Sequence, residues 1–131
     1  MLILNKEHRL AGSRSVDIMV LENENFIIFN KTFVLYDVIM QNCHAHGFSP
    51  NIVYNSSLDS FIFNMVALNE GISILPRPLI GQVDNENIVC CELTPIIPWK
   101  VAIIIRENKY YSTAMLTMLK AMQSHLSSPI P

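Results

Sequence analysis

Hydrophobic positions along the chain form short strand-like runs separated by longer stretches with helical spacing. The strand candidates are Phe26 to Phe29, Asn51 to Asn55 and Ile72 to Leu75. Between them, apolar residues recur every three or four positions from Phe33 to Cys43 and from Leu58 to about Asn69, which is typical of amphipathic helices. Strands joined by helical crossovers pair in parallel, so the pattern predicts an α/β fold with a doubly wound, mostly parallel sheet.

Turn-forming residues fall where this pattern changes. Gly47 is expected to end the first helix, with Phe48 making the apolar contact that follows a glycine cap. Ser57 is expected to cap the second helix and Gly71 to end it. Pro76 then closes the third strand.

Further elements flank this central pattern. We expect a brief strand at Leu2 to Leu4 and a short helix over 17–21 capped by Ser15. After a polar loop come strand candidates at Ile88 to Leu93 and Val101 to Ile105, and then a terminal helix over 111–125.

Composition limits what the chain can be. It has 131 residues, the usual size of one domain, and 50% of them are hydrophobic while only 15% are charged. The net charge is -2 and the lysines and arginines are scattered, so we expect no DNA-binding face here. No stretch approaches the roughly 18 apolar residues of a membrane span, and the N-terminus does not resemble a signal peptide. We expect no membrane contact.

The chain has three cysteines, an odd number, of which Cys90 and Cys91 are adjacent. This favours a reducing, cytoplasmic compartment over a disulfide framework. His44 and His46 beside Cys43 suggest a metal site, but neighbouring positions on a helix do not face one ion, so we expect no metal and no cofactor. No nucleophile is accompanied by a base and an orienting group, and the chain is therefore not expected to be an enzyme.

The residues that follow the first two central strands are the candidate ligand-binding residues. They are Asn30, Lys31 and Thr32 after the first strand, and Asn55, Ser56 and Ser57 after the second. Ligands of parallel sheets sit off the carboxyl ends of the strands, and hydroxyls beside a helix N-terminus suit a small anion. The alternative is that Ser57 is only a cap, Thr32 only a turn residue and Lys31 only a solvated cation.

Several segments, taken in order, resemble one protein family. They are LILNKEHRLAGSRSVDIMVLENENF, FIIFNKT, HAHGFSPNIVYNSS, MVALNEGISILPRPLI and CELTPIIPWKVAIIIREN, followed by the terminal amphipathic helix. Together they cover about residues 2 to 126 and are similar to the C-terminal effector domain of LysR-type transcriptional regulators. The sequence departs from the family pattern at Arg9, where a proline is common, and around Gly71, where the family often has two glycines.

The resemblance implies a periplasmic-binding-protein-like (type 2) lobe with a partial second lobe. About 22–93 would form one complete lobe, and 1–21 and 99–131 parts of an incomplete one, with the DNA-binding helix-turn-helix absent. It implies a small-molecule effector, an organic acid or another anion, bound between two lobes, with Ser56 and Ser57 at a family inducer position. It further implies a homo-oligomer, dimer or tetramer, that reaches DNA only through the missing N-terminal domain.

Two other classes stay open at this point. The chain could be a fragment of a solute-binding protein of a transport system, which shares the two-lobe architecture, or a small α/β enzyme. We also expect self-association, because an incomplete lobe would leave the apolar faces of Leu2 to Leu4 and Met115 to Leu126 uncovered.

Overall fold

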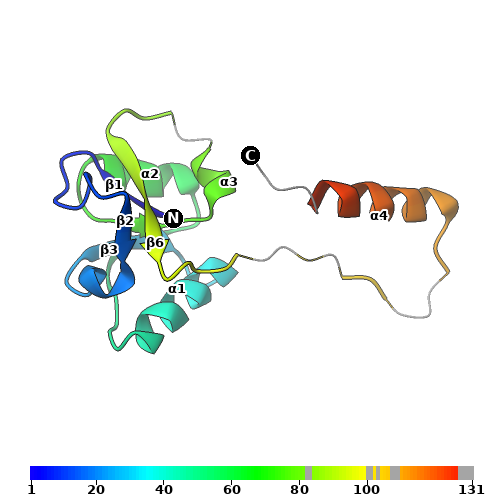
Figure 1. The fold of residues 1–131 in the computed structure, drawn as a ribbon, viewed down its shortest axis with the longest axis horizontal. Helices are drawn as coiled ribbons and strands as arrows, with labels where there is room; N and C mark the ends of the chain where they lie inside the picture. The colour runs from blue at the N-terminus through cyan, green and yellow to red at the C-terminus, as the bar shows by residue number, and fades with distance from the viewer. Residues whose placement is uncertain (82–83, 100–101, 103, 107–109, 127–131) are drawn as a thin grey trace. The chain divides into compact units, whose positions relative to one another are not determined.

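A computed structural model describes residues 1–81, 84–99, 102, 104–106 and 110–126 (Figure 1). The chain forms two compact units, Met1–Trp99 and Lys100–Pro131. The first unit contains β1 (Leu2–Asn5), β2 (Ser15–Asp17), the 3-10 helix η1 (Ile18–Leu21), β3 (Asn25–Phe29), α1 (Val34–Ala45), β4 (Asn51–Ser56), α2 (Asp59–Ala67), β5 (Ser73–Ile74), α3 (Arg77–Ile80) and β6 (Ile88–Thr94). The second contains α4 (Thr113–Leu126).

The central strand, helix, strand unit has the predicted parallel arrangement. β3 and β4 pair in parallel, with Phe26 opposite Ile52 and Phe29 opposite Ser56. A further parallel bridge joins Phe26 to Ile72, just before β5. Residues 26–28 are fully buried, as expected for a run of β-formers that is covered on both faces. The α/β fold with parallel strand pairs is therefore confirmed.

β1 organises a second sheet, of four strands in the order β2, β6, β1, β5. β1 runs antiparallel to β5 and β6, while β2 runs parallel to β6. The pairing buries Leu2, Ile3 and Leu4 completely, so the expectation of an uncovered apolar face at 2–4 is wrong. It also holds residues 1–21 in the same unit as 22–93.

Helix ends follow the sequence prediction in part. Gly47 has a φ of +88° after α1, and Phe48 N–H donates to the Cys43 carbonyl, as a glycine cap predicts. The predicted cap at Ser57 is wrong, because α2 begins one residue later, with Leu58 at the N-cap position and no side-chain cap. Asp17 rather than Ser15 caps η1, since its side chain accepts a hydrogen bond from Met19 N–H.

The end of α2 differs from the prediction for a steric reason. Asn69, with a φ of +61°, makes the left-handed turn that had been expected of Gly71. Gly71 instead lies against the backbone of Asn25, whose carbonyl oxygen would be 2.5 Å from an added Cβ. This glycine is needed for close packing of the segment before β5 against β3.

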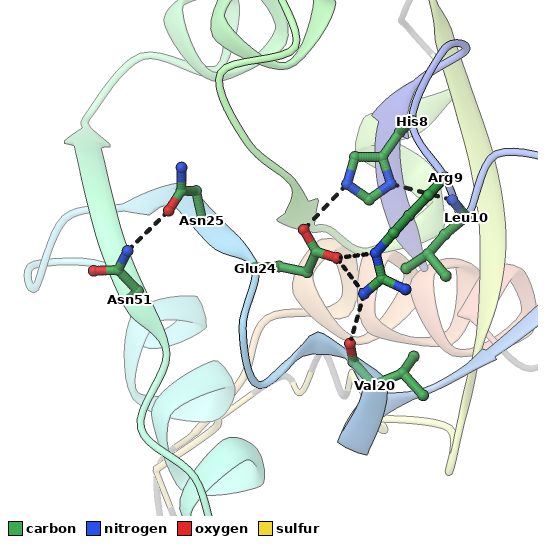
Figure 2. Close-up of polar contacts among 7 residues, drawn as sticks. All are labelled: His8, Arg9, Leu10, Val20, Glu24, Asn25 and Asn51. Atoms are coloured by element: carbon green, nitrogen blue, oxygen red, sulfur yellow. Dashed lines mark hydrogen bonds and ion pairs between the residues drawn. The ribbon is translucent and has the colours of Figure 1, made fainter.

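A carboxylate fixes the loop after β1 to the residue that precedes β3. Figure 2 shows the Glu24 side chain between the His8 ring and the Arg9 guanidinium. Glu24 Oε2 lies 3.2 Å from His8 Nε2, and Arg9 Nε donates to Glu24 Oε1 at 2.9 Å. Leu10 N–H donates to His8 Nδ1, so His8 Nε2 carries the proton that faces Glu24. Beside this cluster, Asn51 Nδ2 donates to Asn25 Oδ1 and joins the first residues of β4 and β3.

The second unit is described mainly by α4. The predicted terminal helix is confirmed, although it begins at Thr113 rather than Tyr111. Among its described side chains, the large apolar residues that are exposed are Met115, Leu116, Met118 and Met122. The strand expected at Val101 to Ile105 lies partly outside the described residues, and Ala102, Ile104 and Ile105 are not in a strand. In the described part of the chain, no helix has the length and apolar character needed to cross a membrane.

Candidate functional site

The loops after β3 and β4 meet at the carboxyl ends of these two strands. The parallel register places Phe29 beside Ser56, and Asn30 N–H donates to the Ser56 carbonyl at 3.0 Å. Asn30 Nδ2 then donates to Ser57 Oγ at 2.6 Å. The two candidate loops therefore form one continuous polar surface on the first unit, as the topology of a parallel sheet predicts.

The direction of each hydrogen bond at Asn30 is fixed by the backbone. Thr32 N–H, which can only donate, points at Asn30 Oδ1 at 3.0 Å, and Thr32 Oγ1 lies 2.6 Å from the same oxygen. Oδ1 is therefore the acceptor and Nδ2 the donor, so Ser57 Oγ accepts from Asn30. Because Ser57 already accepts, its own hydroxyl proton is directed away from Asn30.

Both following helices begin at this surface without side-chain caps. Phe33 and Leu58 occupy the N-cap positions of α1 and α2, and neither side chain can bond a backbone N–H group. Ser56 Oγ accepts from Leu58 N–H, which stabilises the turn before α2 rather than its first helical residues. The positive ends of two helix dipoles thus lie beside the Asn30, Thr32 and Ser57 side chains.

A pocket of about 330 Å³ opens next to these groups. Aromatic and aliphatic side chains form most of its wall, and Phe29 and Phe33 stack with ring centroids 4.7 Å apart. Ser57 and Asp59 contribute its polar lining. The complete lining is Phe29, Phe33, Val34, Leu35, Ser57, Leu58, Asp59, Pro76, Leu79 and Trp99.

The six candidate residues differ in their positions relative to the pocket. Ser57 lines it and accepts a hydrogen bond from Asn30, whose side-chain oxygen in turn accepts from Thr32. Ser56 is bound to the backbone of the α2 turn. Lys31 is exposed, with its Nζ 5.9 Å from the centre of the Tyr36 ring, and Asn55 is exposed on β4 opposite Ile28.

Sequence reasoning missed the apolar wall of the pocket. Phe33 and Leu58 were expected on the apolar sides of the two helices and Leu79 and Trp99 were given no role, yet Phe33, Leu58 and Trp99 are exposed. An indication was present in the sequence, because Phe33 and Leu58 each stand where a helix normally begins with a polar cap. A large apolar residue at that position points to a contact other than capping.

His46 and Cys43 are held at the last turn of α1. His46 Nδ1 lies 2.7 Å from the Asn42 carbonyl at the end of the helix, and burial raises the pKa of the Cys43 thiol to about 11. Cys43, Cys90 and Cys91 are all free thiols. Among the residues that the structure describes, no three His, Cys, Asp or Glu side chains come together in a metal-binding cluster.

Comparison with known proteins identifies relatives over nearly the whole chain. The family model described as "LysR substrate binding domain" matches residues 1–127. YwbI of Bacillus subtilis strain 168, described as an uncharacterized HTH-type transcriptional regulator, is 38% identical over 98% of this chain. This chain spans 43% of YwbI, which is less than half of that relative.

Solved structures share the fold at lower sequence identity. HinK, a LysR family transcriptional regulator from Pseudomonas aeruginosa, aligns with a TM-score of 0.82 and 20% identity, over 95% of this chain and 44% of HinK. The regulatory domain of CcmR from Synechocystis PCC6803, in complex with 2-PG, aligns with a TM-score of 0.77 and 18% identity, over 97% of this chain and 62% of the CcmR domain chain. The periplasmic-binding-protein-like fold is thereby supported independently of the sequence motifs.

Proposed function

This chain belongs to the LysR substrate-binding domain family, and we propose that it senses a small anionic metabolite at the loops after β3 and β4. Asn30, Thr32 and Ser57 would contact the ligand, Ser56 would shape the turn before α2, and Lys31 and Asn55 would border the site. In a complete regulator, the bound ligand would favour one arrangement of a DNA-bound homo-oligomer, dimer or tetramer. Its differential affinity for the two arrangements would supply the regulatory free energy.

The contact between Asn30 and Ser57 is the observation that carries this proposal. It joins two loops that are distant in sequence at the edge of parallel strands where ligands bind, beside a pocket of about 330 Å³. Hydroxyl and amide donors together with two helix N-termini favour a negatively charged group. The solved structure of the CcmR regulatory domain is a complex with 2-PG, which supports a sensing role here.

A regulator accounts for the relatives better than the two alternatives do. YwbI and HinK are transcriptional regulators, and neither is a solute-binding protein of a transport system. Nucleophilic catalysis by Ser57 would require a base beside its hydroxyl, but the group bonded to Ser57 Oγ is an amide, which cannot act as a base. We therefore propose a non-catalytic, cytoplasmic sensor whose DNA contacts come from another part of the regulator.

The proposal is tested by isothermal calorimetry of the 131-residue chain with a panel of organic acids and inorganic phosphate. Ser57→Ala and Thr32→Val remove one hydroxyl each and should weaken binding of any active compound by about tenfold, or 1.4 kcal/mol. Ser49→Ala is the matched control, because Ser49 is exposed before β4, at the end of that strand far from Ser57. An active compound whose affinity is the same in wild type and both variants would place the site elsewhere.

A further inference from the structure

We infer that the ligand of this pocket is a monocarboxylate with an apolar, ring-sized body. Its carboxylate would accept a hydrogen bond from the Ser57 hydroxyl, and its body would lie against Phe33, Leu58, Leu79 and Trp99. The inference rests on the proposed function and goes further by naming the chemical class of the ligand. Three properties of the described residues carry it: hydrogen-bond polarity, the apolar wall and a fixed negative charge.

The directions of the hydrogen bonds at Ser57 favour a ligand group that accepts a hydrogen bond. Backbone N–H of Thr32 donates to Asn30 Oδ1, Asn30 Nδ2 donates to Ser57 Oγ, and the Ser57 proton is then left to donate outward. Within the described part of the chain, no acceptor for that proton is found. A carboxylate oxygen satisfies it, whereas a ligand group that can only donate, such as an ammonium, does not.

The wall of the pocket selects an apolar body. Apart from Ser57 and Asp59, every lining residue is aromatic, aliphatic or proline. Covering such a surface with a hydrocarbon removes apolar area from water, while a densely hydroxylated ligand would lose hydrogen bonds to water without replacing them. The volume, about 330 Å³, lies near the lower end of the range of roughly 300 to 1,000 Å³ for small-molecule pockets. A ring-sized ligand fits this volume better than a nucleotide does.

The negative charge of Asp59 favours a ligand with one carboxylate over a ligand with two. Asp59 lines the same pocket, and its carboxylate accepts only the N–H of Ser60, so no cation neutralises it among the described contacts. Lys31, on the loop before α1, is exposed and does not line the pocket, and its Nζ lies over the Tyr36 ring. A second negative charge on the ligand would be repelled by Asp59, while one charge can be held by Ser57 and the helix N-termini.

Trp99 supplies a direct readout of this pocket. It is the single tryptophan of the chain and part of the lining. We would titrate the 131-residue chain with 3-phenylpropanoate and cyclohexanecarboxylate, and separately with malate, citrate and inorganic phosphate. Tryptophan fluorescence would follow occupation of the pocket, and calorimetry would measure affinity. The apolar monocarboxylates should change the Trp99 emission and bind at least about tenfold more tightly than the polyanions.

Matched variants separate the apolar wall from general surface effects. Leu58 and Leu68 lie at the two ends of α2 and are 63% and 66% exposed, but only Leu58 lines the pocket. Leu58→Ser should weaken binding of 3-phenylpropanoate by about tenfold and Leu68→Ser should leave it unchanged. Asp59→Asn should raise the affinity for malate, and Asp37→Asn, an exposed acid in the first turn of α1 outside the lining, should not.

The possible results distinguish this inference from the proposed function. Ser57-dependent binding of malate, citrate or phosphate, with no binding of the apolar acids, would overturn the ligand class and leave the sensing site in place. Failure of every probe to bind, or binding that is indifferent to Ser57→Ala, would overturn both. Binding of the apolar acids that is weakened by Leu58→Ser and Ser57→Ala, but not by their controls, supports both.

Discussion

Asn30 Nδ2 lies 2.6 Å from Ser57 Oγ, although 27 positions separate these residues in the sequence. The contact exists because β3 and β4 are parallel and end in register, so that the loops after them share one edge of the sheet. Since the Asn30 amide is oriented by Thr32, the polarity of the contact is set within the first loop. The loop after β3 thereby determines that Ser57, in the loop after β4, offers a ligand its hydroxyl proton.

Gly71→Ala should destabilise the first unit by about 1 to 3 kcal/mol, because the added Cβ would lie 2.5 Å from the Asn25 carbonyl oxygen. Both the segment before β5 and the start of β3 would have to move. Gly12→Ala is the control, since no heavy atom lies within 4 Å of a Cβ built there. Urea denaturation measures both variants, and equal stabilities would show that the close approach at Gly71 is not maintained.

Glu24→Gln should lower the free energy of unfolding by about 1 to 3 kcal/mol. The Glu24 side chain is only 15% exposed and accepts hydrogen bonds from His8 and Arg9 (Figure 2), so an amide in its place would lose charge-assisted bonds in a partly desolvated position. Glu22→Gln makes the same change at an exposed position nearby and should alter stability by less than about 0.5 kcal/mol. If both variants lost a similar amount of unfolding free energy, the cause would be the change in net charge and not the contacts of Glu24.

Stability should fall in alkaline solution in a way that depends on Cys43. Burial raises the pKa of this thiol from 9.0 to about 11, so the folded chain holds the proton more tightly than the unfolded chain does. This stabilisation is complete below pH 9, and it is lost as the pH rises towards the folded-state pKa. Denaturation of wild type and Cys43→Ala at several pH values should show a steeper alkaline decline for wild type, and parallel curves would contradict the assignment.

The strand, helix, strand core could be predicted because its information is local. The run from Phe26 to Phe29 and the helical spacing after Phe33 each indicate one type of element, and Gly47 marks the end of α1. The pairing of β1 with β6 could not be predicted in this way. It joins Leu2 to Cys91, and neither run shows in its own sequence which distant strand will cover it.

The placement of the candidate residues, though not of the pocket wall, could be predicted for a similar physical reason. Rules for parallel sheets bring Asn30, Thr32 and Ser57 to one edge without any side-chain detail. The role of Gly71 and the exposed position of Leu58 depend on how segments pack in three dimensions, and cap preferences alone suggested a different role for each. Trp99 lies on the segment that follows β6. It becomes a pocket residue because the fold brings that segment to the same pocket as Leu79 of α3 and Phe33 of the loop after β3.

The central claim is that the loops after β3 and β4 bind a carboxylate through the Ser57 proton, and Asn30→Asp tests it most directly. The new carboxylate can still accept from Thr32 N–H, but it would also take the Ser57 proton and add negative charge beside the pocket. Asn64→Asp makes the same chemical change at an exposed position of α2 outside the pocket lining. Calorimetry with 3-phenylpropanoate should show binding to wild type and Asn64→Asp and at least about a tenfold loss in Asn30→Asp, whereas equal affinities in all three proteins would contradict the account.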